Sequence, residues 1–438
     1  MVFKRFEQIS KKEPDQLDCR SANDALDYGN GLAPFLFRPE VYEKAEEEIP
    51  HPPLPDTTGA CSVLVVWENL PENSIIRPAI ILPLCWKNDS PEHSAKLPEG
   101  LRKLAGEVVE QLNATGWTLQ CAVSFPADFC NISSSKEKWE SAWAPLYGAL
   151  RLAIDGLLPD STVFATGAWE DGLKGVSGLA AKAKVAYEWG AKKFFYPENC
   201  ALSELAELAK VKSAFAEEIE LIAIRNEKKH VAAMSPYLAF LASEPGVDPS
   251  VTVEQLDAYY LITEREKRQG FYLKRIKEKI VERAFQNSAQ DVEKGQNRTL
   301  VCWISGGNEL IDVSIETFKP RRVILFKTKD FDTNDAVKTR IEKNYPSLQV
   351  EQINLEKDLT VGQLKKKINE QLSQRAPGEA LLLDLTSGKV SMSLSLYDYQ
   401  KTDSDKSGYV TDIRYLYWDK KIHSSNLPIP RTTTPSVW

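Results

Sequence analysis

Two side chains, Ser141 and Lys182, lie 41 residues apart and are of the types that nucleophilic catalysis needs. A serine hydroxyl is a poor nucleophile until a base takes its proton, and a neutral lysine amine can do this without histidine. The pKa of a free lysine is about 10.4, and lowering it to near 7 costs roughly 4–5 kcal/mol, which partial burial among apolar side chains supplies. Thr166 is a candidate to hydrogen-bond the amine, and a helix beginning near Ser141 would offer backbone N–H groups to an oxyanion.

The chain around these residues predicts a strand, a helix and a second strand that would position them. We expect strands at Thr162–Gly167 and Lys192–Pro197, with an Ala-rich helix at Gly178–Gly190 between them. Gly190 stands where a C′ glycine ends a helix. Lys182 borders the apolar stripe of this helix, which consists of Leu179, Ala183 and Ala186. Partial burial of the lysine is therefore expected.

This pattern resembles the proteolytic domain of Lon-type proteases, whose catalytic lysine lies in G-L-x-x-K, followed by G-x-K-x-(apolar)₃-P. The matching positions are Gly178, Leu179, Lys182, Gly190, Lys192 and Pro197, with Thr166-Gly167 and Ser141-Ala142 upstream. The resemblance covers roughly residues 61–205 and implies an α+β protease domain with Ser141 as nucleophile, Lys182 as base and Thr166 as its partner. The family's Gly-rich frame before the serine is replaced here by KEKWESAW, with Trp143 in place of glycine. An inactive domain that keeps the fold is therefore an alternative.

The segments upstream of Ser141 fit the order of elements that this resemblance requires. We expect strands at Ser62–Leu70, Arg77–Trp86 and Trp117–Phe125, and an amphipathic helix at Leu97–Gly116. No G-x-x-x-x-G-K-[ST] motif occurs in the chain, so no ATP-driven unfolding is expected. Such a protease would cut only flexible or locally unfolded segments.

Composition excludes several classes of function. The 438 residues are enough for two to three domains, and 42% apolar with 27% charged residues is ordinary for a soluble protein. No apolar run approaches about 18 residues and the N-terminus lacks a signal-peptide core, which predicts a cytoplasmic protein without membrane contact. The seven cysteines form no C-x-x-C pair and the four histidines no H-E-x-x-H, so no metal site is expected. A net charge of −7 argues against broad binding of duplex nucleic acid.

Two regions outside the Lon-like part carry weaker patterns. Residues 1–60 are predicted to be an N-terminal extension, with the acidic, Pro-rich Glu40–Gly59 as a linker or surface strap. Residues 206–298 are predicted to be a helical connector, because the charged stretch of about 202–293 favours helix. Within it, Arg225-Asn226 and His230 form R-N-x-x-x-H, which resembles the motif of HEPN-type ribonucleases. A spacing of five aligns two side chains poorly on one helix face, so a solvated charged helix is the simpler interpretation.

Residues 299–438 alternate between strand-like and helical stretches, which predicts a small doubly wound α/β domain with a mainly parallel sheet. Ligands of such sheets bind beyond the carboxyl ends of the strands. Small residues there let backbone N–H groups approach a phosphate, and a lysine adds positive charge. Two loops have this composition: Ser305, Gly306, Gly307 and Asn308 in one, and Thr386, Ser387, Gly388 and Lys389 in the other.

The second of these loops, DLTSGKVSM, resembles the D/N-x-T-G-G-T-K-x-M loop of CARF domains, the CRISPR-associated Rossmann-fold sensors of cyclic oligoadenylates. Asp384, Thr386, Gly388 and Lys389 fit the pattern, whereas Ser387 replaces its first glycine and the threonine before the lysine is missing. The resemblance implies a cyclic oligoadenylate as activating ligand, held across the two-fold axis of a homodimer or larger assembly. A sensor that also cuts its ligand, through Thr386, Ser387 or Lys389, is compatible with this.

The two resemblances combine into one prediction. The chain would be an α/β protein comprising a Lon-like serine endopeptidase domain, a helical connector and a CARF-like sensor. Activated by cyclic oligoadenylate and needing no other cofactor, it would cut a partner protein in type III CRISPR antiviral signalling. One alternative is a CARF-regulated ribonuclease that uses Arg225 and His230. The other is a catalytically dead Lon-like scaffold that serves as a nucleotide-dependent binding module.

Overall fold

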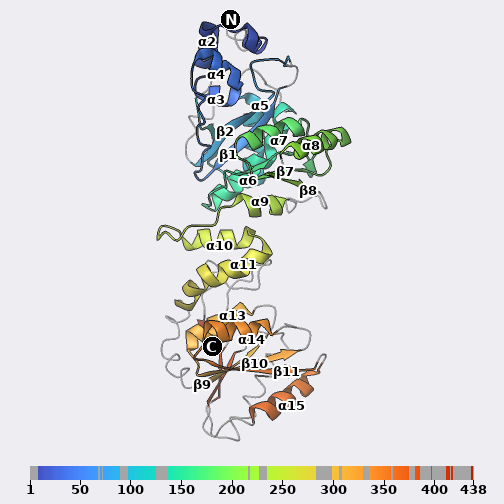
Figure 1. The fold of residues 1–438 in the computed structure, drawn as a ribbon. Helices are drawn as coiled ribbons and strands as arrows, with labels where there is room; N and C mark the ends of the chain where they lie inside the picture. Colours follow the sequence, from blue (N-terminus) through green and yellow to red (C-terminus); the bar gives the residue numbers. More distant parts are fainter. Residues whose placement is uncertain are drawn as a thin grey trace. The chain divides into compact units, whose positions relative to one another are not determined.

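The structure is a computed structural model of the chain (Figure 1). It describes residues 8–67, 70–71, 73–88, 97–124, 137–215, 218–225, 234–282, 298–304, 308–328, 335–356, 359–373, 380–384, 396, 411–414, 416–417 and 436–437. The predicted α/β class is confirmed. The chain divides into two compact units, Met1–Val251 with Ile262–Glu264, and Thr252–Leu261 with Arg265–Trp438.

The first unit contains an antiparallel sheet in which β1 (Ala60–Val66), β2 (Ala79–Asn88) and β3 (Trp117–Cys121) lie in that order. These are the three strands expected from the sequence, with ends shifted by a few residues. Helix α5 (Glu99–Gln111) connects β2 to β3 and buries Leu101, Leu104 and Val108, because the apolar residues recur at helical spacing.

A second sheet of the first unit is parallel and consists of β4 (Val163–Ala165), β7 (Lys193–Pro197) and β8 (Glu220–Ile224). Helix α7 (Leu179–Glu188) precedes β7, so the predicted order of strand, helix and strand is confirmed. Gly190 adopts a φ of 81°, as expected for the glycine that follows a helix end.

Helices α6 (Trp143–Ile154) and α7 each pack against both of these sheets. Helix α6 contacts β1, β2 and β4, while α7 contacts β1, β2 and β7. A short hairpin of β5 (Ala168–Trp169) and β6 (Leu173–Lys174) lies between β4 and α7 in the chain. The start of α6, the end of β4 and the start of α7 are thereby held within one compact region.

Strand β8 lies in a stretch that the sequence predicts to be helical, and that prediction is wrong for Glu220–Ile224. Glutamate, leucine and alanine in this stretch favour helix, but pairing with β7 satisfies the backbone and outweighs local propensity. Arg225 follows the strand directly and is therefore not on a helix, while His230 lies outside the described residues. The helical R-N-x-x-x-H motif is thus contradicted at its first residue.

Residues 1–60 are expected from the sequence to be an extension. Their described part contains the packed helices α2 (Cys19–Gly29), α3 (Ala33–Leu36) and α4 (Pro39–Ala45), blue in Figure 1. Asp18 caps α2 by accepting a 2.7 Å hydrogen bond from the backbone N–H of Ser21. Helix α3 packs against β2, so this region forms part of the core of the first unit.

The second unit is built on a five-stranded sheet with the order β11-β10-β9-β12-β13, in which every pair of neighbours is parallel. The strands are β9 (Arg298–Trp303), β10 (Arg322–Thr328), β11 (Gln349–Leu355), β12 (Ala380–Asp384) and β13 (Thr411–Arg414). The predicted mainly parallel sheet is confirmed. Continuous apolar runs such as those of β9 and β10 are typical of parallel strands that are covered on both faces.

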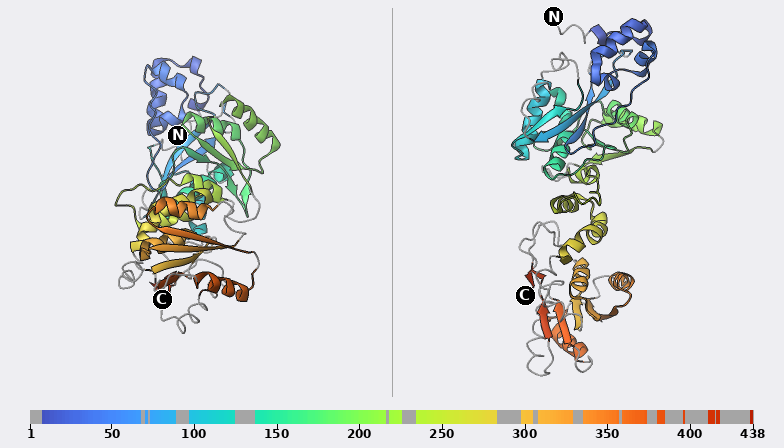
Figure 2. Two further views of the ribbon diagram at one scale, coloured as in Figure 1. Left: turned by 60° about the horizontal axis from the view of Figure 1, so that its bottom comes forward. Right: turned by 90° about the vertical axis from the view of Figure 1, so that its left-hand side faces the viewer.

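Helices cover both faces of this sheet, and Figure 2 shows α13 (Glu309–Phe318) and α15 (Val361–Leu372) on opposite sides. Leu364, Ile368 and Leu372 of α15 pack on one face against a core of strand residues. On the other face, Ser314 of α13 reaches the end of β12. Helix α14 (Ala336–Asn344) leads into β11.

Helices α10 (Val253–Ile262) and α11 (Arg265–Phe271) precede the sheet in the chain, and α11 continues into a π-helical turn at Tyr272–Ile276. Lys277, directly after this turn, forms an ion pair with Glu316 of α13. Within the second unit, the helical segment that follows α11 is therefore joined by this ion pair to α13, the helix that follows β9.

Two glycines of the first unit allow a test of backbone conformation. Gly190→Ala should lower the free energy of unfolding by about 1 kcal/mol, because its φ of 81° is left-handed although space is open. Gly178→Ala should cost more, because φ is 68° and the added Cβ would lie 2.8 Å from Cγ2 of Val66. Urea denaturation measures both.

Gly106→Ala in α5 is the matched control, since no atom lies within 4 Å of the added Cβ and helical alanine is favoured by about 1 kcal/mol. A Gly178→Ala variant as stable as the wild type would contradict the close packing of Gly178 against Val66.

Candidate functional site

The amine of Lys182 lies in the interior of the first unit. The residue is 3% exposed, and Nζ donates a 3.3 Å hydrogen bond to Oγ1 of Thr166, which is 1% exposed at the end of β4. The backbone N–H of Thr166 donates to the carbonyl of Phe195 on β7, which fixes the threonine to the parallel sheet. The structure therefore brings together the lysine and threonine that the sequence predicted as partners.

Ser141 lies beside Thr166, in a 3₁₀ turn (Glu137–Ala142) that leads directly into α6. Thr166 Oγ1 donates to the Ser141 carbonyl oxygen at 3.3 Å, and the N–H of Gly167 donates to the same oxygen at 3.0 Å. The N–H of Ala144 in turn donates to the Gly167 carbonyl at 3.0 Å. This N–H is therefore not available to an oxyanion, and the turn that carries Ser141 is fixed to the Thr-Gly pair.

Gly167 is closely packed. A Cβ there would lie 2.9 Å from Cδ1 of Leu173 and 3.3 Å from Cβ of Ala144. A larger residue would require the Leu173 side chain and its neighbours to shift. Thr166 therefore supplies the hydroxyl that binds the lysine amine, and Gly167 allows the turn of Ser141 to pack closely against the end of β4.

Trp143, the departure from the Lon-type pattern, is buried in an aromatic stack. Its ring centroid lies 4.7 Å from that of Trp169 and 4.8 Å from that of Tyr147. Its Nε1 donates to Oε1 of Gln111 on α5 at 3.1 Å. The indole therefore packs between α6 and the β5–β6 hairpin, and it anchors the helix that follows Ser141.

The surroundings of Lys182 shift its pKa downward, from the usual 10.5 to about 8, because burial disfavours the ammonium form. Glu204 and, to a smaller extent, Cys200 act in the opposite direction and raise this pKa. Burial also raises the pKa of the Cys200 thiol. At pH 7, about a tenth of Lys182 would be the neutral amine that a general base requires.

Sequence reasoning missed Glu204 and Cys200 as neighbours of the lysine. Glu204 Oε2 accepts a 3.0 Å hydrogen bond from the N–H of Leu179, and Cys200 Sγ accepts one from the N–H of Val176. The one local indication was Gly178, which occupies the N-cap position of α7 and has no side chain to cap the helix.

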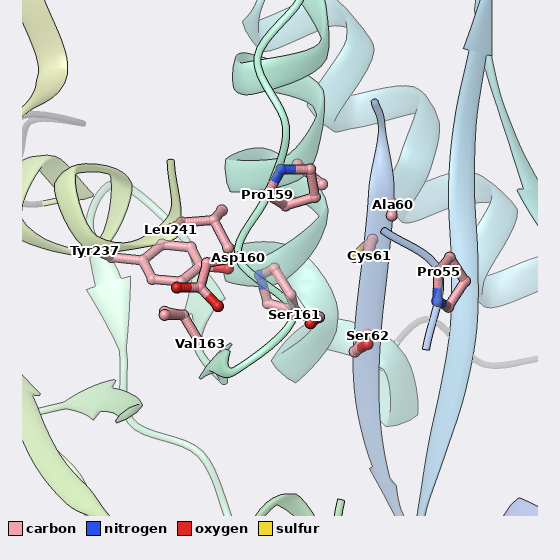
Figure 3. Close-up of a pocket in the computed structure, with 12 residues that line it drawn as sticks. Pro55, Ala60, Cys61, Ser62, Pro159, Asp160, Ser161, Val163, Tyr237 and Leu241 are labelled. Carbon is pink, nitrogen blue, oxygen red and sulfur yellow. The ribbon is translucent and has the colours of Figure 1, made fainter. Parts of the chain in front are cut away.

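A pocket in the first unit lies apart from these residues, and none of Ser141, Thr166 and Lys182 lines it. Figure 3 shows Ser161 on the side toward Ser62 of β1, whereas Asp160 lies on the side of Tyr237 and Val163. Asp160 Oδ1 accepts hydrogen bonds from the N–H and hydroxyl of Thr162, so its carboxylate is part of a turn.

In the second unit, the parallel sheet reverses its strand order between β9 and β12, which are neighbours. Open α/β sheets bind ligands at such a switch point, beyond the carboxyl ends of the strands. Both predicted ligand loops follow these two strands. Asn308 is described, and the other predicted residues, Ser305, Gly306, Gly307, Thr386, Ser387, Gly388 and Lys389, lie outside the described residues.

Asp384 ends β12 at the switch point and is 1% exposed. Its Oδ2 accepts a 2.6 Å hydrogen bond from Oγ of Ser314 on α13 and a 3.8 Å contact from Sγ of Cys302 on β9. The residue that fits the first position of the CARF-like pattern therefore ties β12 to α13 and β9 below the loop.

Asn308 is held by a buried ion pair. Arg340 Nη2 of α14 donates to the Asn308 carbonyl at 2.9 Å and to Oδ2 of Asp312 at 2.6 Å. Asp312 is 0% exposed; burial raises the pKa of its carboxyl, and Arg340 lowers it. Tyr345 donates to both Asp312 and Glu316, so α13 and α14 are joined by a polar network directly after the first ligand loop.

Among the described residues, no group of three or more His, Cys, Asp or Glu side chains is arranged to hold a metal ion. In the same part of the chain, every helix is too short or too polar to cross a membrane.

Comparison with known proteins gives no family model and no curated protein that matches the chain. Among solved structures, Can2 from Sulfobacillus thermosulfidooxidans in complex with cyclic tetra-adenylate is similar over 29% of this chain and 33% of its own, at 19% identity and TM-score 0.22. A type III CRISPR defence DNA nuclease activated by cyclic oligoadenylate is similar over 60% and 36%, at 14% identity and TM-score 0.21. The chain spans about a third of each. TM-scores of this size do not establish a common fold, and the chain's own residues must carry the functional argument.

Replacing Lys182 by methionine should stabilise the protein. The unfolded chain binds the proton with pKa 10.5 and the folded one with about 8, so the lysine costs roughly 3 kcal/mol below pH 8. Lys182→Met should raise the free energy of unfolding by up to that amount at pH 7. The gain in free energy of unfolding should shrink as pH rises from about 8 to 10.5. Above this range the amine is neutral in both the folded and the unfolded chain, so its burial no longer costs free energy.

Urea denaturation at pH 7 and pH 10 measures this difference, with Lys184→Met on the exposed face of the same helix as control. A Lys182→Met variant that is several kcal/mol less stable than the wild type would show that the lysine serves the fold instead.

Removing the cation beside Asp312 should destabilise the second unit. Arg340→Met leaves a buried carboxylate unpaired, which costs about 3–5 kcal/mol. Addition of Asp312→Asn should recover part of the loss, because the uncompensated charge is removed. Urea denaturation measures the effect, with Lys338→Met on α14, a partly exposed lysine, as control. Equal stability of Arg340→Met and the control would contradict the role of this pair.

Proposed function

We propose that the chain is a serine endopeptidase with Ser141 as nucleophile and Lys182 as general base, and that a cyclic oligoadenylate bound to its C-terminal α/β domain activates it. The observation that carries the proposal is the buried Lys182 amine, hydrogen-bonded to Thr166, whose hydroxyl also contacts the main chain of Ser141. Among the described residues, no carboxylate is hydrogen-bonded to this amine, and a lysine at 3% exposure without one is costly for the fold. It is readily explained if the protein needs a neutral amine.

In this mechanism the neutral Lys182 accepts the proton of the Ser141 hydroxyl as its oxygen attacks the peptide carbonyl. The resulting ammonium then gives the proton to the leaving amine, and an acyl-serine forms. Water, deprotonated by the same lysine, attacks the acyl-serine, and the carboxylic product leaves with Ser141 restored. Thr166 orients the amine throughout, and Trp143 and Gly167 hold the serine turn in place.

The activating ligand is proposed from the second unit. A parallel sheet whose strand order reverses between β9 and β12 supports a ligand site at the two loops that follow these strands. The CARF-like pattern from Asp384 to Lys389 favours cyclic oligoadenylate, and it implies a homodimer or larger assembly in type III CRISPR signalling. Activation requires that the ligand bind the active arrangement more tightly than the inactive one.

The function is tested by mass spectrometry of new peptide termini in extract proteins incubated with the protein, with and without cyclic tetra- and hexa-adenylate. We expect discrete cuts that need the nucleotide and disappear in Ser141→Ala and in Lys182→Ala, while Lys184→Ala retains them. Because the neutral amine is the base, cleavage should rise with pH through about 8. The same cuts by Ser141→Ala would exclude this serine as the nucleophile.

The same incubations separate the alternatives. RNA degradation that is lost in His230→Ala and kept in Ser141→Ala would favour the ribonuclease, although Arg225 is not on a helix. Nucleotide-dependent retention of a partner protein that is unaffected by Ser141→Ala and Lys182→Ala would favour a catalytically dead scaffold.

A further inference from the structure

The helix that carries Lys182 begins without a cap of its own. The first N–H groups of a helix have no partner inside it, and a Ser, Thr, Asp or Asn at the N-cap usually supplies one. Here the N-cap is Gly178, whose φ of 68° is left-handed and which makes no side-chain cap. Val66 of β1 lies 2.8 Å from where a Cβ would be, so a larger capping residue does not fit.

Glu204 of α8 (Leu202–Ala214) supplies the missing acceptor from another element. Its Oε2 accepts the N–H of Leu179, the first residue of α7, at 3.0 Å. Lys182 is three residues further along the same helix, so the carboxylate lies within one turn of the proposed base. A negative charge at this position also interacts favourably with the helix dipole.

The segment before α8 is held firmly against the segment before α7. A Cβ at Gly175 would lie 2.6 Å from the carbonyl oxygen of Asn199, so only glycine allows this approach. Asn199 Nδ2 donates to the Leu173 carbonyl at 3.2 Å, and the N–H of Val176 donates to Cys200 Sγ at 3.4 Å. These contacts fix the position from which Glu204 reaches α7.

The groups that face Lys182 come from several elements. Glu204 and Cys200 are the titratable ones, and both favour the protonated amine, with Glu204 first in size. Thr166 contributes an uncharged hydroxyl from the end of β4, and the same hydroxyl donates to the Ser141 carbonyl. Burial lowers the pKa of Lys182 and outweighs the effects of both groups. Glu204 is therefore the main charge that opposes loss of the lysine proton.

We propose that Glu204 is a positioning residue for the Ser141–Lys182 dyad: its carboxylate caps the first turn of the helix that carries the lysine and brings a negative charge to that turn. The inference rests on the proposed function and adds a restraint on it. Of the residues of α8, only Leu208 is buried. The carboxylate that caps α7 therefore comes from a helix that lies largely on the surface.

The test compares Glu204→Gln with Glu204→Ala in the full chain. Glutamine keeps an oxygen that can accept from Leu179 but removes the charge, whereas alanine removes both. Glu207→Gln is the matched control, because Glu207 is an exposed α8 residue paired with Lys210. The pKa of Lys182 is read directly by NMR of lysine labelled with ¹³C at Cε, and its signal is assigned by its absence in Lys182→Met. The pH profile of cleavage is measured in parallel.

We expect the titration midpoint of Lys182 in Glu204→Gln to fall below that of the wild type and of Glu207→Gln. The acidic limb of kcat/KM should move in the same direction, and the rate at pH 7 relative to the plateau should rise several-fold. Glu204→Ala should show the same direction with a lower plateau and a lower Tm, because the helix is no longer capped.

An unchanged or higher midpoint in Glu204→Gln would overturn the inference. If the midpoint falls as expected but the wild type cleaves nothing, the protease proposal fails while the effect of Glu204 on Lys182 stands. The NMR readout needs no substrate, so the two failures are distinguishable.

Discussion

The burial of one amine governs the arrangement of the first unit. Lys182 is taken out of water into the space between α7, the end of β4 and the turn of Ser141, and its hydrogen bond goes to a hydroxyl. Such burial disfavours the ammonium ion and depresses its pKa. The neighbouring features follow from it: Thr166 offers an oxygen, and Gly167 allows the serine turn to approach. Glu204 and Cys200 keep the shift from becoming larger.

The second unit depends on a different constraint, the satisfaction of buried carboxylates at the switch point of a parallel sheet. Asp384 accepts a hydrogen bond from the Ser314 hydroxyl of α13. Asp312 of α13 is paired with Arg340 of α14 and also accepts from Tyr345. The network continues to Glu316 and Lys277. A ligand that moved the loop ending at Asn308 would therefore act on α13, which is also attached to the helix that enters the domain.

Sequence patterns predicted the elements whose apolar spacing is strong. The runs of β1, β2, β9 and β10 are nearly continuous in buried residues, and α5 and α15 have apolar stripes at helical spacing. The patterns failed at β8, whose residues suit either structure, because its partner β7 lies more than twenty residues away in the chain. The sequence patterns also missed α2, α3 and α4. These helices are short, so their apolar residues do not recur at helical spacing over a long enough stretch to be recognised.

The sequence by itself therefore determined the helices and strands with clear apolar spacing and the candidate residues Ser141, Thr166 and Lys182, because these depend only on residue type and local spacing. Only the tertiary structure decided that Thr166 bonds both the lysine amine and the serine carbonyl, that Trp143 stacks on Trp169, and that Glu204 caps α7. These contacts join residues 16 to 26 positions apart in the chain. Which side chains meet at such separations depends on how strands pair and helices pack, and not on propensity within one element.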